Sequence, residues 1–161
     1  MATEGLTEGA TQFRIMAAVM AAGMVAPLAL ALATTVRKRL FTHAEQENGK
    51  AAWLLGLSFI SEGAIPFAAA DPWRVIVSSL VGSTVTGAAV MAFGSELRAP
   101  HGGVWVLPLI SNPLGFLAAI VIGMVISAAL VVALKSMKPN PIVQAEQAAD
   151  AEVEARTPQT V

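Results

Sequence analysis

The chain has 161 residues, of which 55% are hydrophobic and 13% are charged, and its formal net charge is -1. This composition excludes a disordered chain, disfavours a soluble domain and offers no basic surface for nucleic acid. There is no cysteine and there are only two histidines, far apart in the sequence, so we expect no disulfide, no catalytic thiol, no metal site and no cofactor.

Residues 1–14 are mostly small and polar, which predicts a mobile N-terminus without the basic region of a secretory signal peptide. Residues 15–36 carry no charge and are long enough to cross a hydrocarbon core of about 30 Å. Pro27 lies in the middle of this span. A kink there is tolerated in a membrane because neighbouring groups can bind the freed carbonyl, and we interpret Pro27 as shaping helix packing.

The loop over residues 37–50 is the most basic segment of the chain. The positive-inside rule therefore places it in the cytoplasm. His43 lies in this loop beside acidic residues and is interpreted as a solvated histidine.

Residues 51–70 are long enough to span, but Glu62, Gly63 and Pro66 interrupt them. An ionisable group among apolar residues is costly unless it faces a cavity or a partner. Broken backbone at membrane depth persists only where it lines protein or water, as in the substrate sites of transporters. We therefore predict a broken or re-entrant hairpin that carries a substrate or proton site at Glu62. Asp71, which follows it, is expected to cap the next helix.

Two further uncharged stretches, residues 75–95 and 113–134, predict full membrane spans. Both carry small residues at a spacing of four, which indicates helix-packing faces. The small residues are Ser79, Ser83 and Gly87 in the first stretch and Gly115, Ala119, Gly123 and Ser127 in the second.

A second polar stretch, residues 96–103, separates these two spans. Glu96 is expected to pair with Arg98, unless Arg98 lies at the lipid headgroups. His101 is followed by Gly102, which permits unusual backbone angles. A histidine there either binds a substrate hydroxyl or is an ordinary loop residue, and the residues alone leave both open. The short apolar run that follows predicts a second half-inserted segment.

The remaining residues, 136–161, are rich in Ala, Gln and Glu and lack apolar periodicity, which predicts a disordered cytosolic tail. The sequence thus predicts an all-α integral membrane protein with about three full transmembrane helices plus re-entrant or broken hairpins. Its membrane domain covers residues 15–135.

Two motifs carry a resemblance to a known family. Residues 61–72 read Ser-Glu-Gly-Ala-Ile-Pro-Phe-Ala-Ala-Ala-Asp-Pro, and residues 96–103 read Glu-Leu-Arg-Ala-Pro-His-Gly-Gly. Together they resemble the C-terminal part of the fructose-type membrane subunit (enzyme IIC) of the bacterial sugar phosphotransferase system, a subunit about twice as long as this chain.

The resemblance implies a multi-pass protein of the bacterial inner membrane that binds fructose or a similar hexose and moves it inward for phosphorylation. Glu62, with Gly63 and Pro66, would hold the sugar, and His101 and Gly102 would line the same site. The phosphoryl donor would be a cysteine of a partner, enzyme IIB. This chain has no cysteine, so any enzymatic role is limited to translocation.

The resemblance also implies a homodimer surrounded by lipid, and its limited extent suggests a partial or split subunit whose missing N-terminal spans come from a second polypeptide. Two other functions are open: a non-catalytic membrane scaffold or relic, and a proton-coupled secondary transporter that uses Glu62.

Overall fold

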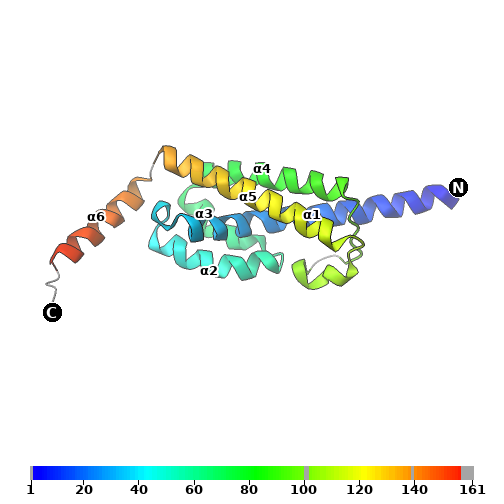
Figure 1. Cartoon of the computed structure of the whole chain (residues 1–161), viewed down its shortest axis with the longest axis horizontal. Coiled ribbons are helices and arrows are strands. Elements are labelled where there is room, and N and C mark those ends of the chain that lie inside the picture. The colour runs from blue at the N-terminus through cyan, green and yellow to red at the C-terminus, as the bar shows by residue number, and fades with distance from the viewer. Residues whose placement is uncertain (1, 100–101, 139, 157–161) are drawn as a thin grey trace.

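The computed structural model describes residues 2–99, 102–138 and 140–156, which are almost entirely helical (Figure 1). The α-helices are α1 (Ala2–Val36), α2 (His43–Leu57), α3 (Ile65–Ala70), α4 (Pro72–Ala92), α5 (Pro113–Met137) and α6 (Pro141–Arg156). Three 3-10 helices connect them: η1 (Lys38–Leu40), η2 (Ser61–Ala64) and η3 (Gly103–Leu109). The predicted all-α fold is confirmed.

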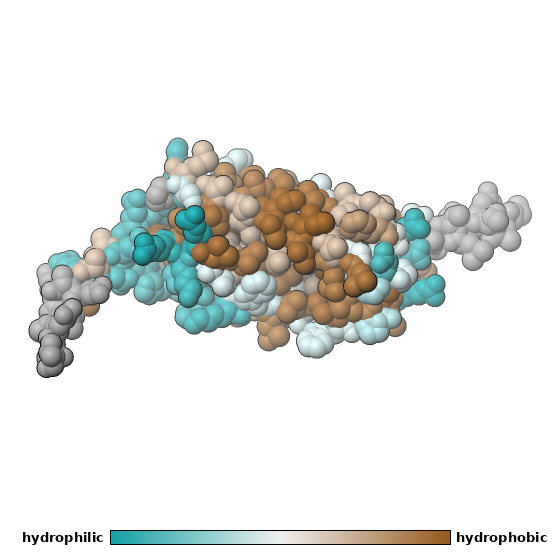
Figure 2. Space-filling model, viewed as in Figure 1, coloured by the Kyte–Doolittle hydropathy of each residue, from teal (hydrophilic) through white to brown (hydrophobic). Residues whose placement is uncertain are grey.

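Helices α1, α4 and α5 pack side by side, and each contains a stretch long and apolar enough to cross a membrane. These stretches are Thr11–Val36, Pro72–Ala92 and Pro113–Met137, which match the three predicted spans. The outer faces carry exposed side chains such as Leu80 and Val121. Figure 2 shows the result as an apolar band between two hydrophilic ends. The described part of the chain is therefore built as a membrane protein.

Helices α4 and α5 contact each other closely because glycines, which have no side chain, lie at their interface. A Cβ atom on Gly82 would lie 2.5 Å from Ser127 Cβ and 2.8 Å from the Gly123 carbonyl oxygen. Small residues allow such close backbone approach within a membrane. Ala119, Gly123 and Ser127 of the predicted stripe on α5 are buried here. On α4, the contact is formed by Gly82 and the residues one helical turn before and after it. Each lies one position before a residue of the predicted stripe, because packing against α5, and not the α4 sequence alone, decides which face is buried.

Helix α2 runs back along α1 from the end at which α1 finishes. Gly49 lies against Thr34 of α1, and Gly56 lies against Pro27, nearer the middle of that helix. The chain then turns through η2 and returns as α3. The predicted break in residues 51–70 is therefore present, but the first arm already begins at His43, within the predicted loop 37–50. We call His43–Ala70 the first hairpin.

The returning arm ends beside the point at which α2 began. Phe67 of α3 packs its ring edge-on to Phe41, with 6.4 Å between the ring centroids and an interplanar angle of 85°. Pro72 then opens α4 at its first turn, where its missing N–H costs no hydrogen bond.

A second hairpin enters from the opposite end of the bundle. Leu97 forms an antiparallel bridge with Ile110, and its N–H donates to the Phe13 carbonyl near the start of the α1 span, at 3.1 Å. The N–H of Ser111 donates to the Glu96 carbonyl at 3.0 Å. We call residues 97–110 the second hairpin; Pro100 and His101 lie outside the described residues.

Both ends of the chain are more helical than the composition predicts. Helix α1 already begins at Ala2, where a mobile terminus is predicted. The predicted disordered tail contains α6, whose first turn is stabilised by a 3.0 Å hydrogen bond from the Ile142 N–H to Asn140 Oδ1. Ala, Glu and Gln are strong helix formers, and Val143 is buried. The sequence prediction gave too much weight to the absence of apolar periodicity.

Candidate functional site

A backbone carbonyl of α1 that has no partner within the helix lies at the centre of the candidate site. Pro27 has no N–H, so the Gly23 carbonyl four residues earlier loses its helical partner. Ser61 Oγ, in the first hairpin, donates to this carbonyl at 3.3 Å. A hydroxyl from another segment thus binds the oxygen that the proline exposes, as expected for a kinked membrane helix. The same bond attaches the end of the first hairpin to α1.

The turn before Ser61 holds a phenylalanine in a left-handed backbone conformation. Phe59 has φ 64°, while Ile60 N–H donates to the Leu55 carbonyl at 2.8 Å and Phe59 N–H donates to the Gly56 carbonyl. These bonds form a Schellman motif, in which glycine is usual at the left-handed position. A non-glycine residue there costs about 1–2 kcal/mol. The Phe59 ring packs where Gly23 lacks a side chain, which offsets part of this strain.

Glu62 lies on η2 at the end of the first hairpin, and its side chain is exposed. Its carboxylate makes no hydrogen bond or ion pair with any other described residue. Gly63, next to it, is buried, and a Cβ there would lie 3.1 Å from Leu55 and 3.4 Å from Pro27. Pro66 is exposed in the first turn of α3, where it opens a helix. We call residues 57–63 the first tip.

The second tip, residues 102–105, lies directly against the first. Gly102 and Gly103 have φ 133° and 60°, angles that side chains rarely adopt. Gly103 is packed so closely on the Leu57–Phe59 backbone that a Cβ would collide with it. Trp105 Nε1 donates to Ser58 Oγ at 3.2 Å, and 72% of this tryptophan is exposed. The glycine end of the second polar stretch therefore contacts the backbone just before Ser61 and Glu62, and His101 itself lies outside the described residues.

The tips meet near the midpoint of the α1 span. Gly23, which both Phe59 and Ser61 contact, lies ten residues after Phe13 and thirteen before Val36. At 1.5 Å per residue these separations correspond to about 15 Å and about 20 Å. Two hairpins thus enter from opposite ends and place the Glu62 carboxylate, glycine backbone and an indole ring near the middle of a membrane-sized bundle.

Several polar residues at the two ends of the bundle have partners that differ from those expected. Asp71 does not cap α4, because its carboxylate instead accepts from Arg74 Nη1 at 2.8 Å. Glu96 pairs with Arg14 at 3.3 Å rather than with Arg98. The Arg98 guanidinium lies over the Phe13 ring, 5.5 Å from its centroid. Sequence reasoning could not find the partners of Glu96 and Arg98, because both contact residues of α1 that are far away in the sequence.

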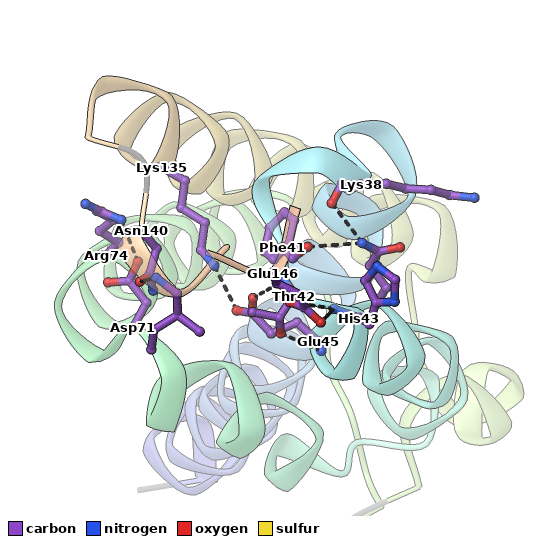
Figure 3. A network of polar contacts seen from close by, with 12 residues as sticks. Lys38, Phe41, Thr42, His43, Glu45, Asp71, Arg74, Lys135, Asn140 and Glu146 are labelled. Atoms are coloured by element: carbon purple, nitrogen blue, oxygen red, sulfur yellow. Dashed lines mark hydrogen bonds and ion pairs between the residues drawn. The ribbon is translucent and has the colours of Figure 1, made fainter. Parts of the chain in front are cut away.

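A second polar cluster, at the base of the first hairpin, was missed altogether (Figure 3). Lys135 Nζ lies 2.8 Å from Glu45 Oε1, and these side chains are only 1% and 3% exposed. The Lys135 ammonium also lies 4.1 Å from the centroid of the Phe41 ring. Glu45 forms a capping box with Thr42 at the start of α2. Only this capping pattern was visible in the sequence.

Helix α6 adds contacts to the loop that precedes this cluster. His43 Nε2 lies 3.1 Å from Asp150 Oδ2, and the His43 backbone N–H donates to Glu146. Gln147 Nε2 donates to the Arg39 carbonyl at 2.7 Å. His43 is thus exposed, as predicted, and contacts an acidic helix. Among the described residues, no group of three His, Cys, Asp or Glu side chains is placed to hold a metal ion.

Three membrane-length helices and two opposed hairpins define a helical membrane protein. Comparison with curated proteins gives the family. The chain is 52% identical over 120 residues to the PTS system fructose-specific EIIB'BC component of Escherichia coli K12, and 56% identical over 115 residues to the component of the same name from Rhodobacter capsulatus. It is 48% identical over 106 residues to the PTS system fructose-specific EIIC component of Haloferax volcanii.

The chain is therefore homologous to part of the fructose-type membrane subunit of the sugar phosphotransferase system, which confirms the resemblance. The three alignments cover 73%, 70% and 66% of this chain but only 21%, 20% and 28% of the relatives. This chain thus spans less than a third of the length of these relatives. No family model and no solved structure matches it.

Proposed function

We propose that this chain is a membrane component of a phosphoenolpyruvate-dependent sugar phosphotransferase system of the fructose type. It binds a neutral sugar at the meeting tips and takes part in moving it inward. The observation that carries the proposal is the contact of the two tips near the midpoint of α1, beside a Glu62 carboxylate that has no partner among the described residues. Relatives named as fructose-specific components support the choice of substrate.

The chemistry of the tips suits a sugar. A neutral ring covered with hydroxyls needs a few fixed acceptors and donors, with an apolar surface against the ring face. In this proposal Glu62 accepts hydrogen bonds from sugar hydroxyls, and His101 lines the same site. Gly63, Pro66 and Gly102 shape the backbone around the site. The exposed ring of Trp105 is available for the ring face.

The proposal includes an orientation. The loop with Arg37, Lys38 and Arg39 lies at the same end of the bundle as Arg74 and the end of α5. By the positive-inside rule this end, with the C-terminal segment, faces the cytoplasm of the bacterial cell. The second hairpin then enters from the outer face of a multi-pass inner-membrane protein. A sugar reaching the tips from outside leaves toward the basic end.

The proposal also requires partners. The chain has no cysteine, so the phosphoryl group comes from the phosphocysteine of an enzyme IIB domain, a component that the names of several relatives include. An exposed carboxylate at mid-depth is costly in a membrane unless other groups cover it. We infer that further spans, supplied by a second polypeptide, cover Glu62, and that the assembled permease is a homodimer in lipid.

The test is to reconstitute this chain in vesicles with the remaining spans and the enzyme IIB domain of a fructose-type system, and to measure sugar phosphate formed inside. We expect formation to need all three components and to fall in Glu62→Gln and His101→Ala. Asp150→Asn, which alters an exposed acidic residue of α6, serves as the matched control and keeps full activity.

Three results would contradict the proposal. Uptake without a phosphoryl donor that collapses with the proton gradient would identify a secondary transporter. Wild-type rates in both Glu62→Gln and His101→Ala would favour a scaffold. Sugar uptake by this chain alone would remove the need for a second polypeptide.

A further inference from the structure

A polar cavity of about 500 Å³ opens between the end of α1 and residues 46–53 of α2. Its volume lies within the range of small-molecule sites, roughly 300–1,000 Å³. It is lined by Thr34, Thr35, Lys38, Gln46, Glu47, Gly49, Lys50 and Trp53. The sugar site proposed above uses none of these residues, so the cavity needs its own explanation.

The cavity lies between the tips and the basic end. Its lining residues follow α2 from Gln46 to Trp53, and α2 continues from Trp53 to its last residue, Leu57, at the first tip. This remaining distance is about 6 Å at 1.5 Å per residue. A molecule that leaves the tips for the basic end along α2 therefore passes the cavity.

Two ammonium groups favour an anionic ligand there. The Lys38 side chain makes no hydrogen bond or ion pair with another described residue, and Figure 3 shows it pointing away from the neighbouring polar network. Lys50 Nζ lies 2.6 Å from Glu47 Oε1, but 74% and 71% of these side chains are exposed. Exposed pairs of this kind are weak, so Lys50 is available to a stronger anion. Lysine is a common partner of phosphate.

The remaining polar groups offer acceptors for hydroxyls. Gln46 Nε2 donates to the carbonyls of Lys38 and Phe41 at 3.1 and 3.0 Å, which fixes the amide and leaves its oxygen free to accept. The Thr35 hydroxyl donates to the Ala31 carbonyl, so its oxygen retains lone pairs for a ligand, whereas the Thr34 hydroxyl is buried against Gly49. The lining thus combines cations with hydroxyl acceptors.

Trp53 completes this arrangement with an aromatic ring. It is half-buried and packs against both apolar clusters of the bundle, which fixes its position at the end of the cavity nearest the tips. A fixed ring, several acceptors and two ammonium groups match a molecule that has a ring face, hydroxyls and a phosphate group.

We propose that this cavity binds a hexose phosphate, the anionic product of the sugar phosphorylation on which this inference rests. Lys38 and Lys50 bind the phosphate group, Gln46 accepts from the hydroxyls, and the sugar ring lies against Trp53. The site holds the product on the cytoplasmic side of the tips, where its negative charge prevents return through the apolar bundle.

The cavity can be tested separately from transport because it has its own reporter. The chain contains three tryptophans, so Trp73→Phe with Trp105→Phe leaves Trp53 as the only one. This variant of the full chain, in a non-ionic detergent, is titrated with fructose 1-phosphate, fructose and inorganic phosphate. We expect saturable quenching of Trp53 fluorescence by fructose 1-phosphate, with an affinity at least tenfold tighter than for either of the other two.

Charge removal then locates the phosphate. Lys38→Gln and Lys50→Gln, each in the single-tryptophan background, should weaken fructose 1-phosphate binding about tenfold, at the lower end of the effect of a hydrogen bond to a charged group. Lys138→Gln removes an exposed lysine at the same end of the bundle that does not line the cavity, and it should leave the affinity unchanged.

Several outcomes would overturn the inference. No quenching, or equal affinity for inorganic phosphate, would exclude a hexose phosphate site. An anionic lipid headgroup carries the same phosphate chemistry, so the titration is repeated with phosphatidylglycerol; quenching by that lipid alone would assign the cavity to lipid.

Glu62→Gln separates this inference from the proposed function, because it should abolish fructose transport while leaving the Trp53 titration unchanged. Transport without quenching would defeat only the product site. Quenching by fructose 1-phosphate in a chain that, once assembled, forms no sugar phosphate would defeat only the proposed function.

Discussion

The first hairpin carries a glutamate at each end, and the two have opposite environments. At its base, Glu45 is 3% exposed, lies 2.8 Å from Lys135 Nζ and accepts from the Thr42 N–H at 2.9 Å. At its tip, Glu62 is exposed and its carboxylate has no partner among the described residues. A buried carboxylate must be paired to be tolerated, so Glu45 has no capacity left for a ligand. Among the described residues nothing uses the acceptor capacity of Glu62, as the proposed sugar site requires.

The largest effect is expected at the base of the hairpin. Lys135→Met leaves Glu45 buried without its cation, which should lower the free energy of unfolding by about 3–5 kcal/mol. Denaturant titration in detergent measures this. The double variant Lys135→Met with Glu45→Leu should recover most of the loss, since both charges are then gone. Lys50→Met, which breaks an exposed pair, should cost no more than about 1 kcal/mol. Equal losses in Lys135→Met and Lys50→Met would show that the buried pair has no structural role.

The next largest effect is expected where the tips touch. Gly103→Ala adds a Cβ at φ 60° that collides with the backbone of the first tip. The left-handed conformation and the overpacking together should cost about 2–5 kcal/mol or force the tips apart. Gly87→Ala is the matched control, because a Cβ there meets nothing within 4 Å. A thermal shift no larger in Gly103→Ala than in Gly87→Ala would argue against this contact.

The two glutamates can also be compared directly by the same substitution. Glu62→Gln should weaken sugar binding about 10- to 150-fold, the effect of losing hydrogen bonds to a charged acceptor, and should change stability by less than about 0.5 kcal/mol. Glu45→Gln should instead lower stability and leave sugar binding nearly unchanged, since it disrupts a buried pair far from the tips. Sugar binding and unfolding are measured on both variants in the assembled permease. A stability loss confined to Glu62→Gln would show that Glu62, and not Glu45, has the structural role.

The smallest effect is expected at the carbonyl that Pro27 exposes. Ser61→Ala removes the hydroxyl that donates to the Gly23 carbonyl, which should cost about 0.5–1.5 kcal/mol and loosen the first tip. Ser136→Ala is the control, since that exposed hydroxyl donates only within its own helix. Faster hydrogen exchange at residues 57–63 in Ser61→Ala alone would locate the effect at the tip, whereas unchanged exchange would show that this bond does not hold it.

Much of the fold follows from the sequence because spans are local features. An uncharged stretch of sufficient length predicts a membrane helix by itself, and Gly63 and Pro66 predict the interruption of the second stretch. The small residues of α5 likewise identify its packing face. Helix α6 was missed because its stability depends on helix propensity, a local bond at Asn140 and contacts with a distant loop.

Only part of the site could be predicted, because local features are visible in the sequence and contacts between distant segments are not. Glu62 and Gly102 stood out because polar residues and glycines interrupt apolar sequence. Contacts between the tips depend on backbone packing between segments far apart in the chain, such as Gly103 against Leu57–Phe59. The pair between Lys135 and Glu45 joins positions 90 residues apart and leaves no local pattern. Pro27 was the one available clue to the docking of the first tip, because a proline in a helix always frees the carbonyl four residues before it.

The most direct test of the central claim, that the two tips meet, is a cross-linking measurement. The chain has no cysteine, so Ser58→Cys with Trp105→Cys introduces a unique pair at the positions joined by the 3.2 Å hydrogen bond. A short thiol-specific cross-linker is applied to the protein in lipid, and the linked peptide is detected by mass spectrometry after digestion. Rapid cross-linking of this pair, with none in Ser58→Cys with Ser136→Cys, is the predicted result. No cross-link between positions 58 and 105, with both thiols accessible to the reagent, would contradict it.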